Sequence, residues 1–447
     1  MLAHRFPPSG GAGVQRNLQL ARHLPAAGVR PIVVTGPGTV EYRWMPADDA
    51  LSDARVQAEI HRLPTTEPPH GNAWEARFER WLRRPARWER WWNAEAPELA
   101  AKVGRDADLV HASVAPYYTA STAIRIARRL GLPLVMDFED PWALDDMLVY
   151  TTRWHRRLEV REMGRMLAAA DAVVMNAPEA RVRVLNAFPG LDPERVVAIP
   201  NAFDPTDFAG PVTPRDDARF RILHAGSLHT ELGLEQRNAS RLRRALGGGA
   251  PGVDFLTRSH IYLLEAMAAL LARRPQLTRS VEVVLAGVFT GPDREVASRY
   301  PFVTLRDFVP HAGTLELMRT ADLLFLPLYD LPPGRRTGLI PHKTYEYLAA
   351  GRPILAAVPD GDARDLLEAS GAARLSRPSD TAAIAAHLEA EIDRWRAGKA
   401  SAVPDPDVVA RCSSERLINE LSALYDAVVA RAASSSSPRP RRAGSPS

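Results

Sequence analysis

Cysteine is nearly absent from this sequence of 447 residues, and the only one, Cys412, has no partner for a disulfide. Disulfide frameworks and cysteine-rich zinc sites are therefore excluded, and Cys412 is best explained as a small core side chain. The 12 histidines show no HExxH or other paired spacing typical of metal ligands. Two Asp-x-Asp sequences, at 360–362 and 405–407, stand in turn-like sequence without further ligands. We expect no metal site and no cofactor.

Long hydrophobic runs are also missing, since no apolar stretch approaches the roughly 20 residues that span a bilayer. The first residues do not form a charged and then apolar leader, so we expect a cytoplasmic protein. Lysine is scarce, and Lys102, Lys343 and Lys399 are the only three. The net charge of +4 comes from four arginines beyond residue 430, where no acid follows, so the body is neutral (4 − 4 = 0). A neutral body argues against a nucleic-acid surface.

What the sequence does contain is a regular alternation of short apolar runs with amphipathic stretches, which is typical of parallel sheets covered by helices. We predict an α/β protein with two Rossmann-like domains facing each other across a cleft. The predicted divisions are a first domain at 1–200, a proline-rich linker at 201–219, a second domain at 220–406, a C-terminal helix at 407–430 and a disordered tail at 431–447.

Individual elements follow from the same alternation. Strands are expected at 30–36, 108–113, 132–138, 171–176, 195–200, 220–226, 281–287, 321–328 and 352–358, and helices at 119–131, 258–274, 313–320, 343–350 and 378–397. The first strand has room for only half its usual length before a glycine-rich turn at residue 9. The Gly- and Arg-rich segment 231–257 is predicted to be a mobile surface insertion.

The glycine-rich turn, PPSGGAGVQR at 7–16, places Gly10, Gly11 and Gly13 before a helix. Glycines let backbone N–H groups approach an anion or a sugar, and a helix N-terminus adds partial positive charge. The spacing is not that of the dinucleotide fingerprint. A tight turn without a ligand explains this stretch as well.

The segment GLIPHKTYEYLAAGRPILA at 338–356 is the most informative in the chain. It places Lys343 at the start of a helix, where a cation and free N–H groups suit a diphosphate. Glu346 follows one turn later, where its carboxylate is able to accept ribose hydroxyls. An N-terminal cap with a solvated lysine is the structural alternative.

Two further stretches carry candidate function. MDFEDPW at 136–142 ends a strand, so Asp137 and Asp140 are candidates for orienting a sugar hydroxyl or acting as a base, with turn capping as the alternative. In 72–92, five tryptophans stand among six arginines, and Trp74, Phe78, Trp81 and Leu82 share one helical face. Tryptophan with arginine suits the headgroup layer of a membrane or a lipid-linked acceptor, and a core-facing stripe with a solvated arginine face is the alternative.

Taken together, HRFPPSGGAGVQR, MDFEDPW, AIPNAFDPTDF, ILHAGSL and HKTYEYLAAGRPILA resemble, in order and over roughly residues 1–430, the retaining glycosyltransferases of the GT-B fold, family 4. This resemblance implies metal-independent transfer from a nucleotide-diphosphate sugar, bound mainly by the second domain, to an acceptor held mainly by the first. The acceptor is expected to be a polysaccharide, a lipid-linked sugar or a small molecule in a bacterial pathway. The resemblance also implies a final helix that crosses back to the first domain.

The resemblance assigns roles to individual residues. Glu346 matches the glutamate that binds the donor ribose, and Val309 the position that contacts the base. Lys343 and the backbone of Gly338, Leu339, Ile340 and Pro341 would meet the diphosphate. The remaining donor-site candidates are Gly10, Gly11, Gly13 and Gly226.

The sequence departs from the family at two places. Gly338 stands where a second glutamate is usual, and the basic pair expected after ILHAGSL is absent, so that Arg258 becomes the candidate for the missing charge. We therefore assign Lys343 and Arg258 to the leaving diphosphate and Asp140 to the acceptor. A catalytically silent binding subunit and a nucleotide-sugar epimerase are the alternative functions.

Overall fold

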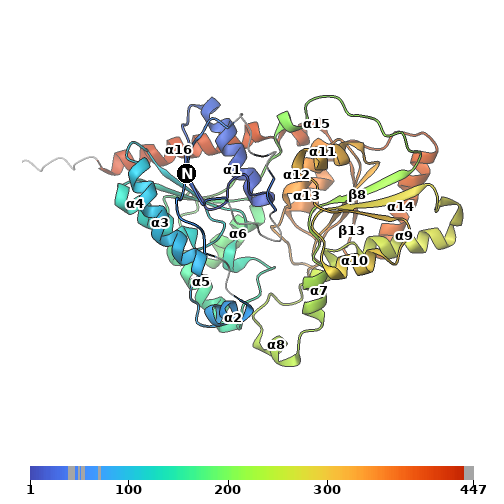
Figure 1. The fold of residues 1–447 in the computed structure, drawn as a ribbon, viewed down its shortest axis with the longest axis horizontal. Coiled ribbons are helices and arrows are strands. Elements are labelled where there is room, and N and C mark those ends of the chain that lie inside the picture. Colours follow the sequence, from blue (N-terminus) through green and yellow to red (C-terminus); the bar gives the residue numbers. More distant parts are fainter. Residues whose placement is uncertain (39–45, 49–50, 52–55, 69–71, 437–447) are drawn as a thin grey trace, which may run out of the picture.

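The computed structural model describes residues 1–38, 46–48, 51, 56–68 and 72–436, and within them it contains two α/β domains side by side (Figure 1). Each domain is built around one parallel sheet with helices on both faces, so the predicted fold class is confirmed. Strands such as β5 and β11 bury every residue, because helices exclude water from both faces of the sheet.

The first domain holds a seven-stranded sheet within the described residues, in the order β3-β2-β1-β4-β5-β6-β7. Its strands are β1 (Leu2–Ala3), β2 (Ile32–Thr35), β3 (Glu59–Arg62), β4 (Val110–Ser113), β5 (Leu134–Phe138), β6 (Ala172–Met175) and β7 (Val196–Ala198). Its helices are α1 (Ala12–His23), α2 (Ala73–Trp81), α3 (Arg87–Val103), α4 (Thr119–Leu130), α5 (Arg153–Leu167) and α6 (Pro178–Ala187). As predicted, the first strand is very short, and β1 nevertheless lies in the middle of the sheet between β2 and β4.

The second domain holds a six-stranded sheet within the described part of the chain, in the order β10-β9-β8-β11-β12-β13. Its strands are β8 (Phe220–Ala225), β9 (Val281–Ala286), β10 (Val303–Arg306), β11 (Leu323–Pro327), β12 (Ile354–Ala357) and β13 (Ala373–Ser376). The helices that follow β8 are α7 (Thr230–Arg237), α8 (Arg241–Leu246), α9 (Ile261–Arg273), α10 (Gly291–Ala297), α11 (His311–Thr320), α12 (His342–Ala349), α13 (Asp362–Ala369) and α14 (Thr381–Arg396).

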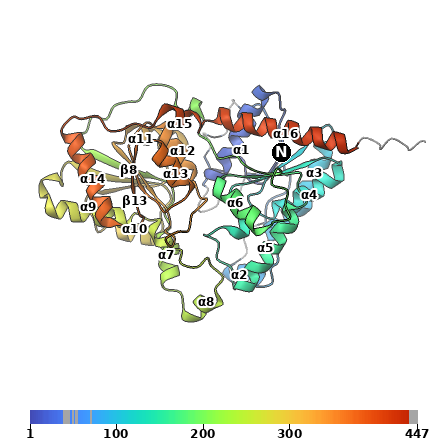
Figure 2. The same cartoon turned by 180° about the vertical axis from the view of Figure 1, so that it is seen from behind.

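The C-terminal helical segment crosses back to the first domain (Figure 2). It consists of two helices, α15 (Pro406–Ala410) and α16 (Ser414–Ser436), where the sequence predicted one. Leu417, Leu421 and Tyr425 of α16 pack against Leu20 and Val135 of the first domain. Because α16 continues to Ser436, the prediction of a tail starting at 431 is wrong for residues 431–436, and the rest of that tail lies outside the described residues.

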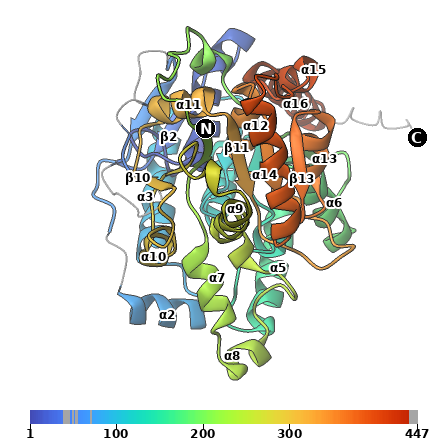
Figure 3. The ribbon, with the colours of Figure 1, turned by 90° about the vertical axis from the view of Figure 1, so that its right-hand side faces the viewer.

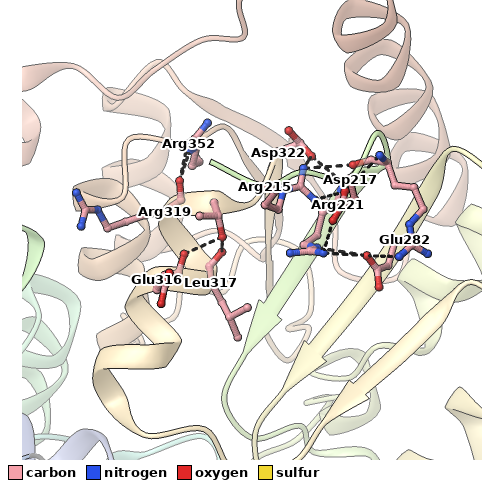
Figure 4. Close-up of polar contacts among 11 residues, drawn as sticks. Arg215, Asp217, Arg221, Glu282, Glu316, Leu317, Arg319, Asp322 and Arg352 are labelled. Atoms are coloured by element: carbon pink, nitrogen blue, oxygen red, sulfur yellow. Dashed lines mark hydrogen bonds and ion pairs between the residues drawn. The ribbon is translucent and has the colours of Figure 1, made fainter. Parts of the chain in front are cut away.

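The predicted linker at 201–219 is fastened to the second domain at its far end (Figure 4). Arg215 makes ion pairs with Asp217 and with Asp322 at the start of β11. Arg221 of β8 binds Asp217 at 2.9 Å and Glu282 at 3.2 Å. The end of the linker therefore moves with the sheet of the second domain.

The segment predicted as a surface insertion, 231–257, is partly core. Its residues Ala250, Val253 and Phe255 are buried in an apolar cluster with Tyr329 and Leu331. The turn after α8 reaches the first domain, where the backbone N–H of Tyr150 donates to the carbonyl of Gly248 at 3.0 Å. The prediction of a mobile surface loop therefore misses this packing. The segment is rich in Gly and Arg, and the few apolar residues that pack were overlooked among them.

Candidate active site

A cavity of about 380 Å³ lies between the two domains. Several lining residues directly follow strands: Asn176 follows β6, Gly226 follows β8 and Gly287 follows β9. The cavity is therefore at the carboxyl ends of the strands in both sheets, where open α/β sheets bind ligands.

Lys343 stands in the first turn of α12 and lines the cavity from the side of the second domain. Its Nζ lies 2.6 Å from the point where a Cβ atom would stand on Gly226, whose φ of +107° also favours glycine. Burial, together with repulsion from Arg258, lowers the pKa of Lys343 to about 7. The ammonium and the helix N-terminus thus point into the same space.

Glu346 lies one turn deeper and is held by two histidines. Its Oε1 is 2.9 Å from Nε2 of His311 and 3.5 Å from Nδ1 of His342. Burial opposes ionisation of this carboxyl group, but the hydrogen bonds from the two histidines bring the pKa of Glu346 well below its ordinary value. The carboxylate is therefore charged and fixed in direction.

Arg258 enters the cavity from the 3-10 turn Phe255–Thr257, which ends the segment after α8. Burial lowers the pKa of Arg258, while attraction to Tyr329, Asp140 and Asp145 counteracts the shift. Its Nη1 lies 3.2 Å from Sδ of Met147, and among the described residues no carboxylate forms an ion pair with it. A guanidinium without such a partner is available to an anionic ligand.

The opposite wall of the cavity is acidic and comes from the loop after β5. Glu139, Asp140 and Asp145 all line it. Burial is the main cause that raises the pKa of Glu139 to about 7, that of Asp140 to about 6 and that of Asp145 to about 7, and repulsion from neighbouring carboxyl groups adds to each shift. Raised pKa values at a cleft are typical of groups that exchange protons or hydrogen bonds with a ligand.

The three glycines of the glycine-rich turn do not all line the cavity. Gly10 and Gly11 line the cavity, and Gly11, with a φ of +98°, precedes α1 as its N-cap. Gly13 does not line it. A Cβ atom on Gly13 would stand 2.8 Å from Oε2 of Glu139, so this glycine makes room for that carboxylate.

Most of the other predicted donor-site positions also face the cavity: Gly226, Val309, Leu339, Ile340 and Pro341. Gly338 does not, because it packs against the first domain. A Cβ atom there would be 2.8 Å from the backbone nitrogen of Ala180 in α6. The roles of all these residues stay predictions, and the structure supplies their positions.

Asp137, the weaker acidic candidate, has a structural partner. Its Oδ2 accepts a hydrogen bond from Nε of Arg16 at 2.7 Å, in the interior of the first domain. It is 2% exposed and is not among the residues that line the cavity. The turn-like Asp-x-Asp sequences are structural as well, since Asp362 accepts from the backbone of Glu179 and Asp405 caps α15.

Among the cavity residues that the sequence analysis missed are titratable side chains: Asp48, Glu139, Asp145, His311 and His342. Glu139 could have been predicted from the sequence, since it stands in MDFEDPW beside Asp140. Nothing in the local sequence marks His311, because its hydrogen bond to Glu346 joins the start of α11 to α12, 35 residues further along the chain.

The tryptophan-rich segment splits into two helices at Pro85, and each half fits one of the two alternatives. In α3, Trp88 and Trp92 are buried in the first domain. In α2, Trp74 and Phe78 are 77% and 60% exposed. No helix among the described residues is long and apolar enough to cross a bilayer, and none of their acidic, histidine or cysteine side chains form a cluster able to hold a metal ion.

Two known domain families match the chain, one within each of the two structural domains. Residues 10–202 match the glycosyl transferase 4-like domain, and residues 255–393 match the glycosyl transferases group 1 domain. No curated protein matches the chain by sequence.

Solved structures resemble the chain over nearly its whole length. The trehalose-6-phosphate synthase OtsA has 14% identity and a TM-score of 0.60, over 95% of this chain and 98% of the other. Anabaena Alr3699/HepE, solved with UDP and glucose, has 14% identity and a TM-score of 0.57 over the same shares. A glycosyltransferase from Rickettsia africae has 12% identity and a TM-score of 0.57, over 94% and 96%. At these identities the likeness shows the fold.

Two facing parallel sheets with a ligand-sized cleft between them define the GT-B class of α/β protein. The matched domains make the assignment specific: the chain belongs to the group 1, 4-like glycosyltransferases and is a glycosyltransferase of class EC 2.4.

Proposed function

We propose that this enzyme transfers a sugar from a nucleotide-diphosphate donor to a hydroxyl group of an acceptor, with retention of configuration and without a metal ion. The observation that carries the proposal is Lys343, whose ammonium lies at the start of α12 against Gly226 inside the interdomain cleft. Anions bind favourably where a cation and helix N–H groups converge.

The donor fits the wall formed by the second domain. Lys343 and Arg258 contact the diphosphate, and Glu346 accepts hydrogen bonds from the ribose hydroxyls. Val309 lines the same wall, where it contacts the base. Uridine is the first base to test, because Anabaena Alr3699/HepE was solved with UDP and with UDP-glucose.

The acceptor fits the wall formed by the first domain. The charged residues of that wall are all acids: Asp48, Glu139, Asp140 and Asp145. Carboxylates bind hydroxyl groups and repel phosphate, so the part of the acceptor inside the cleft is an uncharged or amine-bearing sugar. Asp140 orients the attacking hydroxyl group and is suited to take up its proton.

In the reaction, the acceptor oxygen forms a bond to the anomeric carbon on the face from which the diphosphate departs, the bond from that carbon to the phosphate oxygen breaks, and Asp140 takes up the hydroxyl proton. The electron pair of the broken bond goes to the diphosphate, where Lys343 and Arg258 stabilise the new charge. Preorganised charges in a water-poor site are generally the largest contribution to such a step. With two cations available, this arrangement does not depend on a divalent ion.

The family resemblance extends the proposal to the cell. We place the enzyme on the cytoplasmic side, in the assembly of a bacterial polysaccharide or of a lipid-linked sugar.

The decisive experiment is a thermal-shift panel of uridine, guanosine, adenosine and thymidine diphosphates and their sugars. Wild type is compared with Lys343→Ala and with Lys399→Ala, an exposed lysine outside the cleft. We expect one nucleotide series to raise the melting temperature of wild type and Lys399→Ala, but not that of Lys343→Ala. The absence of any shift in folded protein would favour a catalytically silent binding subunit. Retention is then read from the anomeric configuration of the product, and metal independence from activity in EDTA.

A further inference from the structure

The helix α2 presents its apolar face to solvent and its acidic residues to the protein. Trp74, Phe78, Trp81 and Leu82 are all exposed, Trp74 at 77%. The acids on the other side are neutralised by α3, where Glu75 pairs with Arg87 and Glu79 with Arg90. A surface helix of a globular protein normally has the reverse orientation, with its apolar stripe on the core.

Two other elements extend this apolar surface. Trp154, at the start of α5, is 61% exposed, and Nε2 of its neighbour His155 donates a hydrogen bond to the carbonyl oxygen of Trp81 at 3.0 Å. Leu242 of α8, in the second domain, is 71% exposed. The turn after α8 joins the first domain through the hydrogen bond between Tyr150 and Gly248.

The helices that carry most of these side chains lie at one end of the molecule. Figures 1 to 3 place α2 and α8 together at the same extremity in three orientations. We call this the apolar end surface, defined by Trp74, Phe78, Trp81, Leu82, Val149, Trp154, Leu242 and Leu246. It holds eight of the thirteen large apolar side chains that are exposed in the described part of the chain, so it is a concentrated patch rather than scattered exposure.

Positive charge borders the apolar end surface. Six exposed arginines lie on the same elements, and none of the six has an ion pair among the described residues: Arg77, Arg80, Arg84, Arg153, Arg157 and Arg241. The guanidinium of Arg77 lies 5.6 Å from the ring centroid of Trp74. Tryptophan and leucine beside unpaired arginine is the combination that enters the headgroup layer of an anionic membrane.

We propose that the apolar end surface docks the enzyme on an anionic phospholipid bilayer, with contacts from both domains. A bilayer fits a protruding end better than a rigid protein groove does, because lipids adapt to indole rings at different heights. The complementary charge selects anionic lipid, since each arginine near such a surface adds attraction that salt screens. This docking goes beyond the transfer reaction, because none of these side chains lines the cavity.

Co-sedimentation of the full chain with vesicles tests the proposal. One vesicle type contains phosphatidylcholine alone, and the other contains equal parts of phosphatidylcholine and phosphatidylglycerol. We expect wild type to sediment with the anionic vesicles and to be released in part by salt. The double variant Trp74→Ser/Phe78→Ser and the single variant Leu242→Ser should each reduce the bound fraction, the double variant by about tenfold or more.

The matched control is Val403→Ser, since Val403 is 67% exposed and lies between α14 and α15, away from the apolar end surface. The thermal shift produced by the donor nucleotide monitors the fold and the active site of every variant, so a failure of the proposed function is recognised separately. The proposal is wrong if wild type stays in solution with anionic vesicles, or if the double variant sediments as well as Val403→Ser. A concentration-dependent dimer that the double variant abolishes, without vesicle binding, would identify a second copy as the partner and overturn it.

Discussion

The two walls of the cleft differ in how they obtain their charge. The second domain takes Lys343 from a helix start and Arg258 from a short turn, and both cations lie near glycine or backbone where an anion can approach. The first domain supplies three carboxyl groups from a single loop, and burial raises the pKa of each. The cleft thus has a positive wall facing an acidic wall.

Under the proposed function, this difference lets one cleft distinguish two substrates. An anionic donor is attracted to one wall and repelled by the other, so its orientation is fixed before any specific contact forms. An acceptor without phosphate experiences the opposite preference.

Removal of the positive wall should have the largest effect. In Lys343→Ala the leaving diphosphate loses its nearest cation, and we expect a loss of about 2–4 kcal/mol of transition-state stabilisation, or about 30- to 900-fold in kcat/KM. Steady-state kinetics with the donor identified by thermal shift measure this loss. A variant within twofold of wild type would remove Lys343 from the mechanism, and Lys399→Ala controls for a general effect of lost charge.

A change on the negative wall should separate the two substrates. In Asp140→Asn the carboxylate is lost but the shape is kept, so we expect kcat/KM for the acceptor to fall about 10- to 100-fold. The thermal shift produced by the donor nucleotide should persist. Asp106→Asn, an exposed change outside the cleft, is the control. Equal losses for donor binding and transfer would contradict the division between the walls.

The pH dependence sharpens the comparison, because burial and repulsion from Arg258 lower the pKa of Lys343 to about 7. Below pH 7 the ammonium is charged and attracts the donor, and above pH 7 the free enzyme loses this charge. We therefore expect donor affinity to decrease above neutrality, by up to about tenfold per pH unit. In Lys343→Arg the guanidinium stays charged, so the decrease should become shallower. Titration of donor binding between pH 6 and about 9 measures both profiles, and identical slopes would exclude Lys343 as the titrating group.

The smallest effect concerns the contact between the domains. Gly338→Glu restores the residue usual in the family, but its Cβ would stand 2.8 Å from the backbone of Ala180. We expect a destabilisation of about 1–3 kcal/mol from overpacking, without a gain in activity. Calorimetry measures it, with Gly190→Glu as control, since nothing lies within 4 Å of a Cβ atom there. A stable and faster Gly338→Glu enzyme would show that the position faces the donor.

The sequence predicted the central strands because their burial is recorded in continuous apolar runs, as in LVMDF of β5. It missed β3, β10 and β13, which lie at the edges of the sheets. An edge strand such as β3, EIHR, is partly exposed and needs no apolar run, so periodicity gives no signal for it.

The candidate site likewise contains residues that the sequence predicts and residues that it does not. Lys343, Glu346 and Asp140 were predictable because they stand at the ends of strands and starts of helices, where ligand sites occur in this architecture. Local sequence cannot predict that Glu139 fills the space above Gly13, or that His311 reaches Glu346, since these contacts join segments more than 30 residues apart. The sequence could not predict whether the apolar face of α2 is exposed or buried, because periodicity defines a helix face but does not show what covers it.

The return of α16 to the first domain has a consequence for biosynthesis. Leu417, Leu421 and Tyr425 complete an apolar cluster whose other members include Leu20 and Val135. During translation, the first domain therefore leaves the ribosome with that face uncovered and keeps it so while the whole second domain is made. The N-terminal half therefore completes its folding only after α16 has been synthesised. A nascent chain stalled before residue 414 should expose an apolar surface that chaperones can bind.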